Sequence, residues 1–222
     1  MKEIHKRSLL VQDFLRLRWL FFVPLAVLFL FLPFSAWQRC EAFRLMGATE
    51  PPLRELMFDS QVWCSFFSLW WPFFILKEYI EGDGNELLFT TRRARRLLPV
   101  VLAGMVLWLA LCGLLMVGYS ALFSSMVWNY LMIVIQTVLY TAVFFFLCFL
   151  LRSAVFGMMV VFIYHVFAAY FLPQDMQYLS IFVKEFGEFP HETVVSFWPL
   201  VLCSAVVLLL GVLLNRRYRG TL

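Results

Sequence analysis

Residues 97–151 read LLPVVLAGMVLWLALCGLLMVGYSALFSSMVWNYLMIVIQTVLYTAVFFFLCFLL and contain no charged side chain. As one helix these 55 residues would reach roughly 80 Å, whereas the hydrocarbon core of a bilayer is only about 30 Å thick. The run therefore has to turn once, and a polar cluster marks the place: Gly118, Ser120, Ser124 and Ser125. It predicts two membrane-spanning helices, over residues 98–119 and 127–151.

The composition of the whole chain excludes a soluble protein. Its 222 residues are 63% hydrophobic, 19% aromatic and 14% charged, with a mean hydropathy of +0.85, whereas soluble domains are about 45–50% apolar and about 25% charged. The same figures exclude a disordered chain. Transmembrane strands would alternate apolar and polar residues, and the apolar runs here are continuous. The expected fold class is therefore all-α, a polytopic membrane protein.

Four further apolar runs predict the remaining four spans. The run that begins at residue 62 is the weakest of them. Only Arg152 and Ser153 separate the fourth span from the fifth, so a tight turn is expected there. We expect one transmembrane domain over residues 1–222 with six spans, at about 19–37, 62–80, 98–119, 127–151, 153–172 and 195–214.

The distribution of charge predicts the orientation of these spans. With the N-terminus inside, fourteen of the 18 Lys and Arg residues fall in inner segments and four in outer loops, as expected for short cytoplasmic loops. Both termini are therefore expected in the cytoplasm. The basic residues are spread over four inner segments without a nucleic-acid-reading motif, so no nucleic-acid partner is expected.

The N-terminal residues 1–18 predict an interfacial helix that leads into the first span. An apolar stripe recurs there at helical spacing: Leu10, Val11, Phe14 and Leu17. A generic basic anchor that only orients the chain is the alternative. A cleavable signal peptide fits poorly, because the following apolar run is longer than a typical signal core and Asp13 lies in the polar lead.

The inner segment over residues 81–97 has the shape of a docking element. Asp83 and Glu86 come first, around two glycines, and a run of arginines follows, an order that suits the dipole of a short helix. Its apolar residues would face the membrane bundle and its polar face a cytoplasmic partner. A solvated, positively charged inner loop is the alternative.

This segment resembles the coupling helix of the ABC-2 type permease family, the membrane subunits of ABC exporters. The likeness lies in an E-x-x-x-G…E-L-L…T-T pattern directly after the second of six spans, behind a basic N-terminal helix. It extends to the outer, extracellular segment 173–194, where the family carries short re-entrant helices, but Arg92 stands where the family commonly has Pro. The resemblance implies that these residues dock an ATPase subunit: Glu81, Asn85, Glu86, Leu87, Leu88, Thr90, Thr91, Arg92 and Arg93.

The resemblance also implies partners and a location. They are a P-loop ATPase subunit that carries ATP and Mg, a second permease chain, identical or different, and the lipids of the plasma membrane. This chain has no G-x-x-x-x-G-K-[ST] motif, so no ATPase site and no cofactor of its own are expected. The aromatic-rich spans favour a hydrophobic, peptide or drug-like cargo.

Polar residues inside the spans are candidates for a substrate path. Gln136, Thr137 and Tyr140 share a face of the fourth span with Thr141, and His165 lies in the fifth. The alternative is that they form helix-to-helix hydrogen bonds, each worth about 0.6 kcal/mol in membranes.

Other functional classes remain as alternatives to an exporter subunit. They are a non-transporting accessory or immunity subunit and a carrier without an ATPase. The spans carry no central Asp or Glu, which disfavours ion coupling. An enzyme is not expected, because the three His are far apart in the chain, no H-E-x-x-H or G-x-S-x-G motif occurs, and no metal site is predicted.

Overall fold

Helices make up all the regular structure that is described. The computed structural model describes residues 17–47, 52–82, 97–121, 125–172, 180–183 and 190–219. The all-α prediction is confirmed for this part of the chain. The expected interfacial helix over residues 1–18 lies outside the described residues, apart from its last two positions.

The elements follow one another in a simple order, and the η labels mark a short 3-10 helix (η1) and two π-helical turns (η2 and η4). They are η1 (Arg18–Phe21), α2 (Phe22–Ala26), η2 (Val27–Phe31), α3 (Leu32–Leu45), α4 (Leu53–Phe67), α5 (Trp70–Glu81), α7 (Leu97–Ser120), α8 (Met126–Leu150), α9 (Ala154–Val166), η4 (Phe167–Phe171), α10 (Pro190–Ser196) and α11 (Trp198–Arg219).

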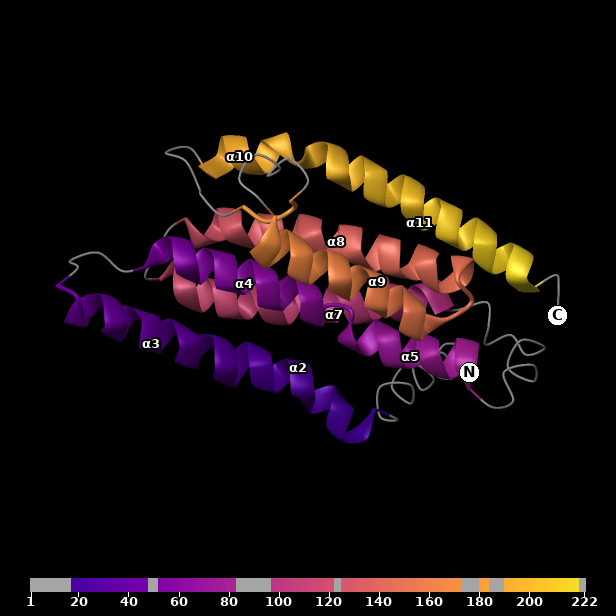
Figure 1. Cartoon of the computed structure of the whole chain (residues 1–222), viewed down its shortest axis with the longest axis horizontal. Coiled ribbons are helices and arrows are strands. Elements are labelled where there is room, and N and C mark those ends of the chain that lie inside the picture. Colours follow the sequence, from indigo (N-terminus) through magenta and orange to yellow (C-terminus); the bar gives the residue numbers. More distant parts are fainter. Residues whose placement is uncertain are drawn as a thin grey trace, which may run out of the picture.

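Within the described ranges, five helical stretches are long and apolar enough to cross a membrane, which makes the chain a multi-pass membrane protein. They are Arg18–Leu45, Leu97–Ser120, Met126–Leu150, Ala154–Phe171 and His191–Arg217. The first stretch and Leu97–Ser120 run in the same direction along the long axis of the molecule, because α4 and α5 return the chain between them, and the later stretches alternate in direction (Figure 1).

The first of these helices is longer than its apolar run. It continues past Trp37 and ends at Leu45. Two residues later, Gly47 has a positive φ of 79° and donates its N–H to the Arg44 carbonyl. Glycine reaches this left-handed conformation without a steric penalty, so it is a natural stop signal for a helix. Hydropathy predicts only the apolar part of this helix, because the C-terminal end of the helix is set by Gly47.

In the region of the predicted second span, residues 62–80, two helices, α4 and α5, are observed in place of one, with a break at Ser68 and Leu69. Proline has no N–H and its ring clashes with the carbonyl four residues earlier, so Pro72 is tolerated only in the first turn of a new helix, where it lies in α5. The Ser68 hydroxyl also donates to the Ser65 carbonyl at 2.6 Å, giving that backbone group a local partner.

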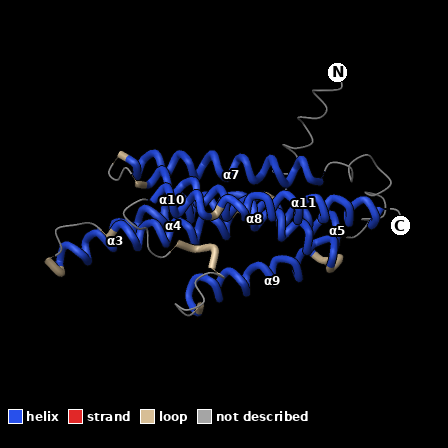
Figure 2. Tube along the Cα trace, turned by 90° about the horizontal axis from the view of Figure 1, so that it is seen from above, coloured by secondary structure: helices blue, strands red, loops and turns tan. Residues whose placement is uncertain are grey.

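Helix α8 lies at the centre of the bundle. It packs against α4, α7, α9, α10 and α11, and Figures 1 and 2 show it between α4 and α11 in one view and between α7 and α9 in the other. Helix α11 approaches α8 closely at Gly211, where an added Cβ would lie 2.9 Å from Phe145 Cδ1 and 3.1 Å from the backbone Cα of Phe146. Only a residue without a side chain fits there.

The turn between α8 and α9 is as tight as expected. Arg152 takes up a left-handed conformation with φ 53°, and the Ser153 N–H returns to the Cys148 carbonyl at 3.1 Å. This pattern closes the carboxyl end of α8. Ser153 then begins α9 by accepting a hydrogen bond from the Phe156 N–H.

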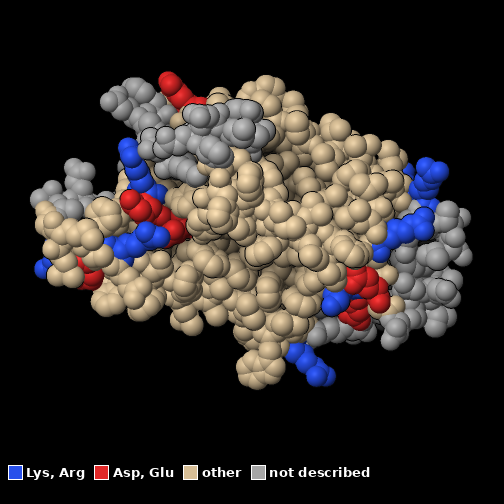
Figure 3. Space-filling view, viewed as in Figure 1, with Lys and Arg blue, Asp and Glu red and all other residues tan. Residues whose placement is uncertain are grey.

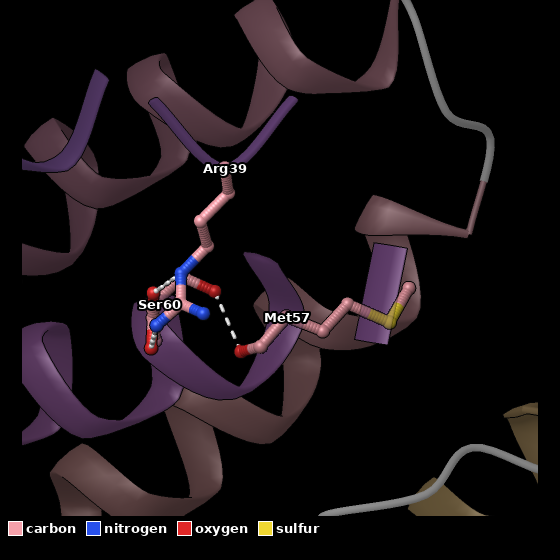
Figure 4. Close-up of polar contacts among 4 residues, drawn as sticks. Arg39, Met57 and Ser60 are labelled. Carbon is pink, nitrogen blue, oxygen red and sulfur yellow. Dashed lines mark hydrogen bonds and ion pairs between the residues drawn. The ribbon is translucent and has the colours of Figure 1, made fainter. Parts of the chain in front are cut away.

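The first helix is fastened to the α4–α5 pair near both of its ends. At one end the indole N–H groups of Trp70 and Trp71 donate to the carbonyls of Leu20 and Phe21 at 2.9 and 3.2 Å. Towards the other end Arg39 forms a two-point ion pair with Asp59, with nitrogen to oxygen distances of 2.6 and 3.0 Å. Figure 4 shows Arg39 reaching towards α4, beside the hydrogen bond from Ser60 to Met57.

Charged side chains gather towards the two ends of the long axis and leave a broad uncharged band between them (Figure 3). At one end of the bundle, which includes the end of α5 and the α8–α9 turn, most charged residues are basic. At the opposite end both basic and acidic residues occur. Described basic residues at the first end are Arg18, Lys77, Arg152, Arg216 and Arg217.

The contact at Gly211 yields a first prediction. Replacing Gly211 by Val should destabilise the protein by about 1–3 kcal/mol, because the new side chain would overlap α8 backbone that cannot move aside. The measurement is thermal unfolding of the purified chain in detergent.

The matched control is Gly118→Ala, at a helical glycine whose Cβ would meet nothing within 4 Å. This variant should unfold at the same temperature or higher, since alanine favours helix over glycine by up to about 1 kcal/mol. Equal unfolding temperatures for Gly211→Val and the unaltered protein would contradict close α8–α11 packing.

Candidate functional site

Three amide side chains meet in the interior of the bundle, each with no exposed surface: Gln61 of α4 and Asn129 and Gln136 of α8. Gln136 lies about 15 Å along α8 from its first residue, at a rise of about 1.5 Å per residue, so it is near the middle of the helix. Amides this deep have no water to bind and must find partners within the protein.

The amides form a continuous hydrogen-bonded chain, here called the amide cluster (Gln61, Asn129 and Gln136). Gln136 Nε2 donates to Gln61 Oε1 at 2.8 Å, and Gln61 Nε2 donates to Asn129 Oδ1 at 3.1 Å. Asn129 Nδ2 donates in turn to the Ser60 hydroxyl at 2.7 Å. The cluster therefore joins α4 to α8 through side chains that polarise one another.

The non-helical segment 180–183 supplies the remaining partners. Gln61 Oε1 accepts from the Val183 N–H at 3.0 Å, and Gln61 Nε2 donates to the Val183 carbonyl at 3.4 Å. Gln136 Nε2 donates to the Ile181 carbonyl at 2.8 Å. Irregular backbone is tolerated at membrane depth only where protein groups satisfy it, and here two glutamines do so.

Aromatic rings hold the same segment from its other side. The ring of Phe182 lies 5.2 Å from that of His165 and 6.2 Å from that of Phe58, in edge-to-face contacts. The Ser180 hydroxyl donates to the Ala168 carbonyl at 3.3 Å. All four residues of the segment therefore contact the bundle, although Ile181 and Phe182 were expected within short re-entrant helices.

Three of the four predicted path residues contribute to this region. Gln136 belongs to the amide cluster, and the Tyr140 hydroxyl lies 3.1 Å from Nδ1 of His165, which joins α8 to α9. Thr137 is fully buried, and its hydroxyl has no hydrogen-bond partner among the described residues, nor does that of Thr141. The observed contacts of Gln136, Tyr140 and His165 are hydrogen bonds between helices and to segment 180–183. That these residues line a substrate path stays a prediction.

The predicted ATPase-docking residues are represented by Glu81 alone, since the other eight lie outside the described residues. The Glu81 carboxylate accepts hydrogen bonds from the Ser153 hydroxyl and, at 3.1 Å, from the backbone N–H of Val155. A carboxylate is favoured at a helix N-terminus, where it binds free N–H groups and the positive end of the dipole. Glu81 therefore links the end of α5 to the start of α9.

Two amides that the sequence analysis did not single out, Gln61 and Asn129, complete the site. Gln61 falls just outside the apolar run that begins at residue 62, and Asn129 is a single amide in a strongly apolar helix. An amide next to or within an apolar run was the available signal, because such a group must be satisfied internally. No local signal showed that segment 180–183 would supply the partners.

Two further features complete the description of the site. Across the described ranges, no three His, Cys, Asp or Glu side chains gather as metal ligands would. A surface groove of about 730 Å³ lies between the first helix and α4, and it is almost wholly apolar. Its lining residues are Ala26, Val27, Phe29, Leu30, Phe31, Phe34 and Trp63.

Comparisons of the chain with protein-family models, with curated proteins and with solved structures find no match. The geometry and chemistry of the chain itself therefore carry the functional argument.

Two substitutions, one in the amide cluster and one beside it, are expected to differ in their effect on stability. Gln61→Leu should destabilise the protein by about 1–3 kcal/mol, because it removes the buried hydrogen bonds of Gln61 to Asn129, to Gln136 and to both backbone groups of Val183. Thr137→Val should leave stability unchanged or raise it, because it removes a buried hydroxyl that makes no hydrogen bond.

Thermal unfolding of both variants in the same detergent makes the comparison. A loss of stability in Thr137→Val as large as that in Gln61→Leu would contradict the hydrogen-bond assignment.

Proposed function

We propose that this chain is the membrane permease subunit of an ABC-2 type exporter in the plasma membrane. It would act with a separate P-loop ATPase subunit, which binds ATP and Mg, and with a second permease chain. The cargo would be hydrophobic, a peptide or a drug-like molecule. The resemblance of residues 81–93 to a coupling helix motivates this proposal, and a described contact supports it.

The contact that carries the proposal is that of Glu81 with the N-terminus of α9. An ATPase can act on a membrane helix only through a linkage that resists displacement. Glu81 is the last residue of α5 and the first of the inner segment, and it binds both Ser153 and the Val155 N–H. A movement of the inner segment would thus be transmitted to α9.

The route continues from α9 to the amide cluster. His165 of α9 contacts the Phe182 ring, and Phe182 lies between Ile181 and Val183, whose backbone groups bind Gln136 and Gln61. A displacement of α9 would therefore disturb the packing of segment 180–183. In this way an event at one end of the bundle would reach its interior, as an ATP-driven permease requires.

The proposed topology has six crossings with both termini in the cytoplasm. The helices α4 and α5 together would make the second crossing, since residues 53–81 are about 43 Å long even as two stacked helices. The end that carries Arg18, Arg152 and Arg216 would face the cytoplasm.

A second candidate function is a membrane subunit that binds a partner without transporting anything. The observation in its favour is that most hydrogen bonds of the amide cluster are already satisfied within the chain, as in a purely structural joint.

The topology can be tested with reporter fusions. Alkaline phosphatase fused after Gly47 should be active, because that position would be outside the cell, whereas fusions after Arg92 and after Arg219 should be inactive. Green fluorescent protein at the same three positions should give the reverse pattern. Equal activity after Gly47 and Arg92 would mean that α4 and α5 do not cross the membrane, and it would contradict six spans.

The exporter proposal itself is tested by co-purification. The chain is extracted from its native host in mild detergent, the proteins recovered with it are identified by mass spectrometry, and ATP hydrolysis is measured. A P-loop ATPase should be recovered in roughly equal amount. Glu86→Lys should abolish this recovery, because it reverses a charge in the docking segment.

The control for Glu86→Lys is Glu192→Lys, an equivalent charge reversal at an α10 side chain that is 73% exposed. This variant should leave the ATPase bound. Recovery of the chain without any ATPase would refute the exporter proposal and favour the non-transporting subunit.

A further inference from the structure

The amide cluster binds segment 180–183 through its backbone. Gln61 contacts both the N–H and the carbonyl of one residue, Val183, and Gln136 contacts the carbonyl of Ile181, two positions earlier. The chain bends at Phe182, and the Phe182 N–H donates to the Ser180 hydroxyl at 3.1 Å. The two glutamines therefore bind the backbone of this short segment on both sides of its bend.

Recognition of this kind does not depend on the side chains of the bound peptide. The side chain of the middle residue, Phe182, lies in a ring-lined position formed by Phe58 and His165, and those of Ile181 and Val183 are buried as well. The ring of Phe66 contacts His165 as well, at 5.2 Å. The position therefore suits a bulky apolar or aromatic side chain.

The cluster also has hydrogen-bonding capacity that segment 180–183 leaves unused. Gln136 is fully buried, and its Oε1 atom accepts no hydrogen bond in the described part of the chain. A buried carbonyl without a donor is unfavourable by about 1–3 kcal/mol in general. The hydroxyls of Thr137 and Thr141, next along the same helix, are unpartnered too. A ligand with one more N–H group would satisfy Gln136 where the chain's own segment does not.

We propose that Gln61 and Gln136 form a binding site for the backbone of an apolar peptide, and that Ile181–Val183 occupies this site as an internal competitor. The inference rests on the proposed function, since it names the cargo class of the exporter as peptide. Segment 180–183 would leave the site before a cargo peptide binds.

The test measures binding of a radiolabelled probe, the blocked tripeptide acetyl-Ile-Phe-Val-amide, to the purified full-length chain in lipid nanodiscs. Two variants weaken the internal competitor. Val183→Pro removes the N–H that donates to Gln61, and Ser180→Ala removes the hydroxyl that bonds the Ala168 carbonyl and the Phe182 N–H. Each should bind the probe about 5–10-fold more tightly than the unaltered chain, as expected for the loss of one or two competing hydrogen bonds.

Two controls identify the atoms responsible. Adding Gln61→Leu to either variant should weaken probe binding at least about tenfold, since the contacts to both backbone groups of one residue are lost. A probe N-methylated at its valine lacks the N–H that Gln61 accepts, and it should bind the opened variants at least about fivefold more weakly. Gly118→Ala, which meets no neighbouring atom, should leave binding unchanged.

Several outcomes would overturn the inference. They are unchanged binding in both opened variants, unchanged binding after Gln61→Leu, or equal binding of the N-methylated probe, which would indicate a merely apolar pocket for a lipid or drug. If Val183→Pro does not fold, as judged by size-exclusion chromatography, Ser180→Ala decides the question, because both glutamines and the Val183 N–H are intact in it.

The outcome is separable from that of the exporter proposal, because probe binding needs no ATPase. Recovery of an ATPase without glutamine-dependent peptide binding would refute only the cargo class. Glutamine-dependent binding without any ATPase would refute the exporter and leave a peptide-binding membrane protein.

Discussion

A buried amide group in a membrane bundle must find its hydrogen bonds inside the protein, and the arrangement around α8 follows from this constraint. Gln61 and Gln136 lie without exposed surface among apolar helices. They satisfy each other and hold the backbone of residues 181 and 183. The constraint explains how non-helical chain can lie in the interior of the bundle, and why α4 faces α8 with its polar residues.

The constraint also connects distant parts of the molecule. Segment 180–183 binds α4 and α8 through hydrogen bonds, and it binds α9 through the contact of Phe182 with His165. At the opposite end of α9, Glu81 joins this helix to α5. The interior cluster and the end of the bundle where Glu81 joins α5 to α9 are therefore two ends of one contact path, which is the physical basis for relating a movement at that end to a change in the interior.

Two of the long apolar runs predicted a helix to within one residue at each end, because burial in lipid requires a helix that is apolar on every side. The expected helix over residues 98–119 is observed at Leu97–Ser120, and that over 127–151 at Met126–Leu150. The region of the expected span over 62–80 is divided into two helices for a local reason, since Pro72 and the serine at position 68 interrupt the helix where hydropathy does not change. The site was foreseen in part: Gln136, Tyr140 and His165 were singled out, and Gln61 and Asn129 were not.

Composition and hydropathy alone establish that the chain is helical and belongs in a membrane, because solvation by lipid acts on each segment independently of its neighbours. Which polar groups meet is a different matter. The pairing of Gln61 with Val183, 122 positions apart, depends on how α4, α8 and segment 180–183 pack, and no local pattern encodes it. Tertiary structure decides it, because a hydrogen bond in a dry interior forms only between groups that packing brings within about 3 Å.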